Sequence, residues 1–101
     1  SKVSHLLDSL RWLAMHYNRK DQTYWVSFKN ELVHFDKNFR NLKTYRQGDG
    51  YNSPALNFVI DNGGNLWFYN ILSQINRLDK TTGTITTLSE TDGYKNKIFL
   101  V

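Results

Sequence analysis

The sequence contains no cysteine, so neither a disulfide nor a thiolate metal site contributes to its stability. It also contains no apolar run close to the roughly 20 residues that a membrane-spanning helix requires. The longest such stretch is IFLV, at positions 98–101. No signal-peptide pattern is visible. We therefore expect no membrane contact in this segment.

Patterns that would carry chemistry are also missing. The three histidines, His5, His16 and His34, do not have the spacing of paired metal ligands. The stretch DNGGN lacks the remaining ligands of a calcium loop. No motif supplies the context of a catalytic nucleophile, and the acidic residues fall mainly at turns. We expect no metal, no cofactor and no catalytic residue, so the chain is predicted not to be an enzyme.

The composition favours one small, β-rich domain. The chain has 101 residues, of which 40% are hydrophobic and 15% aromatic, and this is enough for a modest core. The net charge is +4, and the densest basic group is Arg40, Lys43 and Arg46. These three residues alternate with apolar ones, as expected for the solvent-facing side of a surface strand. A nucleic-acid site would gather basic residues with aromatic residues on one surface, so we expect no direct nucleic-acid binding.

The sequence repeats itself. The segment YWVSFKNELVHFDKNFRNLKTYRQGDGY, from Tyr24, aligns with LWFYNILSQINRLDKTTGTITTLSETDGY, from Leu66. Trp25 then matches Trp67 at a spacing of 42 residues, and the two Asp-Gly-Tyr triplets match at a spacing of 43. The difference implies one inserted residue in the 71–74 turn. Internal repeats of this length indicate a repeated supersecondary unit.

A period of 42–43 residues with short strands is typical of one four-stranded β-propeller blade. We predict an all-β fold with two four-stranded antiparallel blades and the start of a third, an excerpt of a larger propeller. Repeat one covers about residues 10–53, repeat two about 54–95, and the third blade begins at 96–101. The expected strands are Arg11–Tyr17, Tyr24–Phe28, Leu32–Phe35, Asn41–Tyr45, Ala55–Ile60, Asn65–Tyr69, Gln74–Leu78, Thr84–Leu88 and Lys97–Val101.

The segment 6–17 allows two interpretations. HLLDSLRWLAMHY has apolar residues at helical spacing, and Ser4 is available as an N-cap. The repeat, however, places Arg11–Tyr17 opposite the expected strand Ala55–Ile60. We follow the repeat and predict a strand.

The second unit, IDNGGNLWFYNILSQINRLDKTTGTITTLSETDGY, resembles the two-component regulator propeller repeat. That repeat combines Gly-Asn-Leu-Trp, an Arg-x-Asp strand end and an Asp-Gly exit. The first unit is a weaker match, because NRKDQTYW replaces the usual turn before the tryptophan and KNEL lacks the usual glycine. Together the two units cover about Leu10 to Tyr94.

The resemblance implies a setting. Repeats of this family form the periplasmic sensor region of hybrid two-component proteins, whose ligands tend to be oligosaccharides derived from glycans. It implies a non-catalytic extracytoplasmic sensor fragment of a protein that carries histidine kinase activity elsewhere. The alternative is a structural or protein-interaction module that acts as a spacer or a dimer surface. Because two blades do not close a propeller, we expect an excerpt of a longer protein. Its partners would be the rest of its own propeller, an oligosaccharide, and copies of itself.

Candidate site residues fall into two groups. The Asp-Gly-Tyr exits lie in loops between blades, where ligands often bind in propellers. We expect ligand contacts from Tyr51, Asn52, Tyr94 and Asn96, with Lys29, Asn30 and Ser73 ranked lower. The other group is expected to be structural: the tryptophans fill the space between blades, although sugar stacking is the alternative, while the aspartates and glycines shape turns. This group comprises Trp25, Trp67, Asp36, Asp79, Asp49, Gly50, Asp92 and Gly93.

Overall fold

The computed structural model describes residues 12–88, which form two four-stranded antiparallel sheets. Strand order follows chain order in both: β1-β2-β3-β4 and β5-β6-β7-β8. Both sheets are open, and the prediction of an all-β fold is confirmed. The strands are β1 (Ala14–Asn18), β2 (Thr23–Ser27), β3 (Leu32–Phe35), β4 (Asn41–Tyr45), β5 (Ala55–Ile60), β6 (Leu66–Asn70), β7 (Ile75–Leu78) and β8 (Ile85–Thr87), with a short 3-10 helix, η1 (Gln47–Asp49), between the sheets in sequence.

The predicted strands agree with the observed ones to within a few residues at each end. β3, β4 and β5 have the predicted bounds, and β1 begins three residues later than expected, at Ala14. The strand interpretation of the ambiguous segment therefore holds from Ala14 onward. Residues 6–11 and the predicted strand Lys97–Val101 lie outside the described residues.

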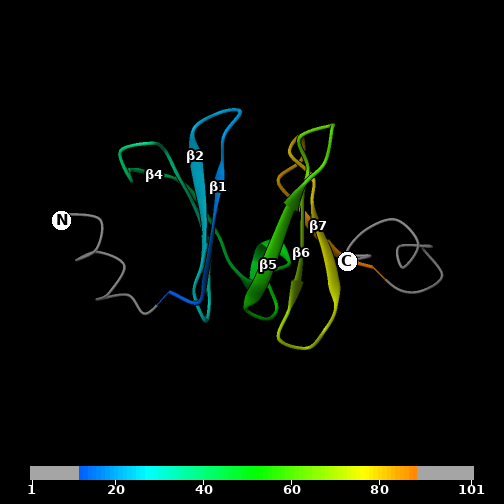
Figure 1. The fold of residues 1–101 in the computed structure, drawn as a ribbon. Coiled ribbons are helices and arrows are strands. Elements are labelled where there is room, and N and C mark those ends of the chain that lie inside the picture. The colour runs from blue at the N-terminus through cyan, green and yellow to red at the C-terminus, as the bar shows by residue number, and fades with distance from the viewer. Residues whose placement is uncertain (1–11, 89–101) are drawn as a thin grey trace.

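The two sheets stand side by side, and β1 lies next to β5 (Figure 1). The β1–β2, β3–β4, β5–β6 and β7–β8 turns are at one end of the sheets, which is the upper end in Figure 1; we call it the turn end. The β2–β3 and β6–β7 turns and the link from β4 to β5 are at the other end, the link end.

Strand pairing repeats in register between the sheets. Trp25 lies opposite His16 on one side and His34 on the other. Trp67 lies opposite Val59 and Arg77, which are each 43 residues further along than those partners. The two tryptophans therefore occupy equivalent positions, as the sequence alignment predicted. The two tryptophans are 42 residues apart, and one extra residue between β6 and β7 returns the spacing to 43 at Arg77.

The main core lies between the sheets. It is built from residues that alternate along each strand, because successive side chains point to opposite faces. In β6, for example, Leu66 and Phe68 are buried in this core while Trp67 points to the other face. Ser27 is fully buried, and its hydroxyl donates to the Ala55 carbonyl across the interface at 2.7 Å. The core comprises Trp25, Leu32, Tyr45, Tyr51, Ala55, Phe58, Leu66, Phe68, Leu78 and Ile85.

The link from β4 to β5 locks the first sheet to the second. Asp49 closes η1 by accepting a hydrogen bond from the Arg46 backbone N–H at 2.9 Å. Tyr51 is 3% exposed, and its hydroxyl donates to the Phe28 carbonyl at 3.0 Å while accepting from the Ala55 N–H at 2.9 Å. One side chain therefore joins the end of β2 to the start of β5.

We predict that Tyr51→Phe lowers the free energy of unfolding by about 2 kcal/mol, because it leaves a buried carbonyl and a buried N–H without their partner. Burial raises the pKa of Tyr51 to about 12, above the ordinary value of 10.0. The stability from the neutral phenol is present below pH 10.0 and is lost as the pH rises toward about 12. Urea unfolding should therefore show a smaller alkaline loss in Tyr51→Phe than in the wild type. Tyr17→Phe, at an exposed ring, is the control and should change neither quantity.

Candidate functional site

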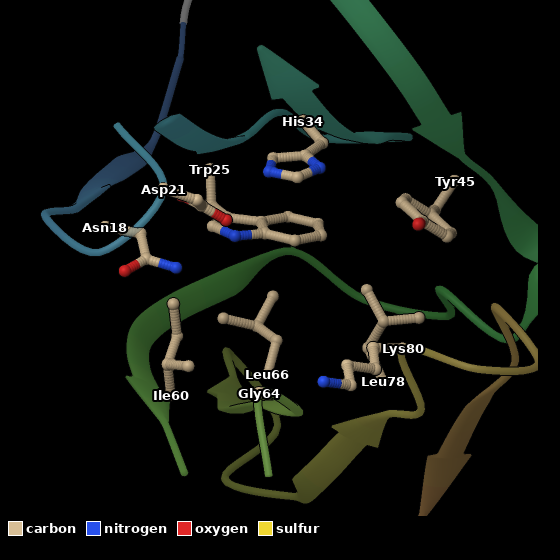
Figure 2. Close-up of a pocket in the computed structure, with 10 residues that line it drawn as sticks. All are labelled: Asn18, Asp21, Trp25, His34, Tyr45, Ile60, Gly64, Leu66, Leu78 and Lys80. Carbon is tan, nitrogen blue, oxygen red and sulfur yellow. The ribbon is translucent and has the colours of Figure 1, made fainter. Parts of the chain in front are cut away.

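A small cleft opens between the two sheets at the turn end, and we call it the inter-sheet cleft (Figure 2). Its volume is about 200 Å³. Sheet one supplies most of its polar and aromatic groups, and sheet two supplies an apolar wall with one lysine. The lining residues are Asn18, Asp21, Trp25, His34, Tyr45, Ile60, Gly64, Leu66, Leu78 and Lys80.

The β1–β2 turn places two polar side chains at the cleft. Asn18 accepts a hydrogen bond from the Lys20 N–H through its side-chain oxygen at 3.1 Å, which leaves its amide nitrogen on the side of the cleft. Asp21 accepts two bonds at one carboxylate oxygen, from the N–H of Thr23 at 3.1 Å and from its hydroxyl at 2.6 Å. The second oxygen of Asp21 has no bond of this kind.

An imidazole lies flat on the indole of Trp25. The rings of Trp25 and His34 are 3.9 Å apart and within 6° of parallel. The Nε2 atom of His34 lies 2.8 Å from the Thr23 hydroxyl, and that hydroxyl donates to Asp21. Nε2 must therefore carry the proton, because the hydroxyl has its lone pairs left as acceptors. The bonds from His34 to Thr23 and from Thr23 to Asp21 hold the imidazole on one face of the Trp25 indole. The other face of the indole, on the side of the cleft, faces sheet two.

The two equivalent tryptophans differ in what their N–H groups do. Trp67 Nε1 donates to the carboxylate of Asp61 at 2.8 Å. Asn18 occupies the position equivalent to Asp61, and among residues 12–88 no acceptor is found for Trp25 Nε1. Trp25 is 8% exposed, and Figure 2 shows its nitrogen directed toward Asp21 and Asn18. No buried side-chain nitrogen or oxygen in this part of the chain lacks a partner, so the Trp25 N–H is open to the cleft, where water or a ligand can accept its proton.

Sheet two completes the cleft. Leu66 and Leu78 are each 2% exposed and form its apolar wall. The backbone N–H of Lys80 donates to the Asn65 side chain at 3.1 Å, which holds the start of the β7–β8 turn beside the β5–β6 turn. Gly64 has a φ of +85°, and a Cβ there would lie 2.9 Å from the Lys80 amine. Glycine at this position leaves room for the lysine to lie across the cleft.

The cleft combines groups that suit a hydroxyl-rich ligand. Trp25 Nε1, the Asn18 amide and the Lys80 ammonium are hydrogen-bond donors, and the free oxygen of Asp21 is an acceptor. A sugar hydroxyl both donates and accepts, so it can use either kind of partner. The volume is below the 300–1,000 Å³ typical of drug-sized ligand sites, and a site of this size holds one small ring.

Acidification should weaken this part of the fold. Burial lowers the pKa of His34, and the Asp21 carboxylate offsets part of the effect; burial also lowers the pKa of His16. A depressed histidine pKa means that the stability is present above 6.5 and is lost as the pH falls through the folded-state value. We predict a falling urea midpoint below about pH 6.5, with a smaller fall in His34→Gln. An unchanged pH profile in that variant would show that His34 does not carry the effect.

Of the residues that the sequence proposed for ligand contact, those within residues 12–88 lie at the link end, away from this cleft. Tyr51 is in the core with its hydroxyl satisfied, so it offers no atom to a ligand in this arrangement, and Asn52 is exposed. The lower-ranked Lys29, Asn30 and Ser73 are exposed in the β2–β3 and β6–β7 turns. The remaining candidates, Tyr94, Asn96, Asp92 and Gly93, lie outside the described residues.

Two of the predicted turn aspartates have the expected geometry. Asp36 accepts bonds from the N–H groups of Asn38 at 2.8 Å and Arg40 at 2.9 Å. Asp79 accepts from Thr81 at 2.8 Å and Thr82 at 3.0 Å. Bonds from backbone N–H groups lower the pKa of both carboxyls. These carboxylates therefore serve the hairpin turns.

Sequence reasoning missed Asn18, Asp21, His34 and Lys80 as site residues. One signal was present in the alignment: the turn before Trp25 has asparagine where the turn before Trp67 has the aspartate that holds the indole. This difference appeared only as a weaker repeat match. In residues 12–88, no helix is long and apolar enough to cross a membrane, and no group of three potential metal ligands occurs.

Comparison with known proteins gave no match: no family model, no curated protein and no solved structure resembles the chain at a significant level.

Proposed function

We propose that this chain is a non-catalytic sensor module, a two-blade excerpt of an extracytoplasmic β-propeller in a hybrid two-component signalling protein. Its setting is periplasmic, and its ligand is an oligosaccharide derived from a glycan. Support comes from the repeat that resembles the sensor-propeller family, and from two sheets whose pairing recurs in register at that repeat's spacing. Binding would shift an equilibrium between arrangements of the sensor, which the kinase part of the parent protein reads.

The observation that carries the ligand proposal is the unpartnered N–H of Trp25 in the inter-sheet cleft. Its register equivalent, Trp67, has a carboxylate partner. The fold can therefore provide an acceptor within the protein for the tryptophan N–H at this position, as it does for Trp67. In the first sheet the same donor is left for another acceptor, and a sugar hydroxyl fits that role. Sensor action needs binding alone; the carboxylates of Asp36 and Asp79 do not line the cleft and are engaged in hairpin turns.

Titration calorimetry of the 101-residue chain with neutral and acidic tetrasaccharides tests the proposal. We expect one class to bind, and Trp25→Phe to weaken that binding about tenfold by removing the donor while keeping an aromatic ring. Trp67→Phe is the matched control and should bind as the wild type does. Urea unfolding of both variants shows that they remain folded. Absence of binding by every sugar, or equal loss in both variants, would contradict a sugar site in the cleft.

A second candidate function is a structural or protein-interaction module, and one observation favours it. The face of the first sheet that carries Trp25 packs on the second sheet, and the equivalent face of the second sheet carries Trp67. A further sheet, or another protein, would pack on the Trp67 face of the second sheet in the way that the second sheet packs on the Trp25 face of the first. Val59 is 39% exposed on this face, opposite Trp67.

Light scattering after size-exclusion chromatography separates this candidate from the first. We expect the wild type to self-associate and Val59→Asp to be monomeric. Leu42→Asp, at an exposed apolar residue of β4, is the control and should associate as the wild type does. A wild-type chain that stays monomeric at high concentration would count against a docking role.

A further inference from the structure

A second hollow lies beside the inter-sheet cleft, along the neighbouring strands β1 and β5; we call it the β1–β5 groove. Its volume is about 390 Å³, which falls within the 300–1,000 Å³ range of small-molecule sites. Asn18 and Ile60 line both hollows, so the groove and the cleft adjoin at these two residues. Together they have room for more than one sugar ring.

The groove has a positive edge and an apolar floor. Arg19 and Lys20 supply two cations from the β1–β2 turn, while Phe58 and Val59 of β5 supply apolar surface. His16 of β1 lies over Phe58, with ring centroids 6.3 Å apart. The lining of the groove includes no carboxylate.

The two cations are not used by the described fold. Within residues 12–88, the ion pairs are those of Arg40 with Asp36, Arg46 with Glu31 and Arg77 with Asp79. Arg19 and Lys20 are exposed and take part in none of them. Asp21, the carboxylate next to them in the turn, accepts two bonds from Thr23 at one oxygen and forms no ion pair with either cation.

The turn itself presents these side chains. The Gln22 N–H donates to the Asn18 carbonyl at 2.8 Å, and the Lys20 N–H donates to the Asn18 side chain at 3.1 Å. Both bonds hold residues 18–22 in a tight turn with Arg19 and Lys20 next to each other at its tip. The equivalent turn of the second sheet, DNGGN, has no cation. The positive charge is therefore particular to the first sheet, as is the free N–H of Trp25.

We propose that the β1–β5 groove selects an anionic oligosaccharide, one that carries carboxylate or sulfate groups. An anionic ring lies in the groove, where Arg19 and Lys20 bind its charged group and the exposed side chain of Val59 contacts its apolar face. The adjoining ring enters the inter-sheet cleft, where Trp25, Asn18 and Lys80 donate to its hydroxyls. Arginine and lysine bind carboxylate and sulfate oxygens through charge-assisted hydrogen bonds, which are about twice as strong as neutral ones. This inference rests on the proposed function and names the class of its ligand.

Calorimetry with the whole 101-residue chain tests the selection by charge. The probes are tetragalacturonic acid, the neutral galactose tetrasaccharide and a sulfated galactose tetrasaccharide. We expect either anionic probe to bind about tenfold more tightly than the neutral one, with the difference falling at high salt. The carboxylate and sulfate probes then show which anionic group is preferred. Equal binding of neutral and anionic probes would overturn this inference and leave the proposed function standing; failure of all three would overturn both.

A pair of double variants locates the effect. Arg19→Gln with Lys20→Gln should remove the preference of the chain for the anionic probes over the neutral one. Lys37→Gln with Arg40→Gln removes the same charge from the exposed β3–β4 turn and should keep the preference. Loss in both double variants would mean that net charge alone is responsible, which contradicts a site in the groove. Tighter binding of a single-stranded oligonucleotide than of either anionic sugar would assign the groove to nucleic acid instead.

Discussion

Trp25→Ala is expected to lower the free energy of unfolding by about 3–5 kcal/mol, which is the range for removal of a buried aromatic side chain. Trp67→Ala, at the equivalent register position, is expected to cost about 1–2 kcal/mol. Trp25 is 8% exposed and packs in the core between the sheets, against His34 and Tyr45. Small domains are stable by about 5–15 kcal/mol, so this loss is a large part of the total.

The smaller effect at Trp67 follows from its surroundings. Its indole is partly exposed on the outer face of the second sheet, so truncation uncovers less apolar surface. It loses one hydrogen bond to Asp61 and a contact with the Arg77 guanidinium, which lies 5.8 Å from the ring centre. Urea unfolding of both variants under the same conditions measures the difference. Equal losses would show that Trp67 is as fully packed as Trp25, which would place another protein surface over it.

The second large effect is expected at Gly50. Its φ is +102°, and a Cβ there would collide with the Ile85 carbonyl oxygen of β8. The contact is with backbone, so no side-chain rotation relieves it. Gly50→Ala should therefore lower the free energy of unfolding by about 2–5 kcal/mol, from backbone strain together with the displacement of β8.

Gly48 provides a matched control two residues earlier in the same link. A Cβ at Gly48 meets no atom within 4 Å, so Gly48→Ala should change the free energy of unfolding by less than about 0.5 kcal/mol. Thermal unfolding of both variants by circular dichroism compares them directly. If Gly50→Ala were as stable as Gly48→Ala, the link would not contact β8 as the structure shows.

The stability predicted to depend on Gly50 and Tyr51 affects how a loss of ligand binding at these residues is interpreted. Gly50 and Tyr51 belong to an Asp-Gly-Tyr triplet in which the sequence predicted a structural role for Asp49 and Gly50 and ligand contact for Tyr51. In the structure the triplet serves the junction between the sheets: Asp49 closes η1, Gly50 passes close to β8, and Tyr51 bonds both sheets. Loss of binding in a variant of this triplet would first have to be separated from loss of folding.

Much of the fold was predictable because strand signals are local. Alternation of apolar residues, turn residues such as the Asp61–Gly64 segment, and the spacing between Trp25 and Trp67 appear directly in the chain. The helical spacing of residues 6–17 was overridden at Ala14 by pairing with β2, which is a contact between strands. The repeat alignment had predicted a strand at this position, and β1 is a strand.

The cleft and the groove were not predictable in the same way. They depend on which strands lie side by side, and β1 and β5 are about 40 residues apart in sequence. Lys80 reaches the cleft because its turn is bonded to Asn65, and Asp21 faces it because Thr23 holds its carboxylate. Each of these residues looks like an ordinary turn residue in the sequence.

The sequence by itself determined the repeat, the eight strand positions in residues 12–88 and the equivalence of the two tryptophans, because these follow from local periodicity and turn chemistry. The tertiary structure alone decided what each tryptophan does. Trp25 is covered by the second sheet and its N–H faces a cleft, whereas Trp67 is bonded to Asp61 on an outer face. Burial and hydrogen-bond partners depend on which surfaces meet in space, and two positions with the same local pattern can meet different surfaces.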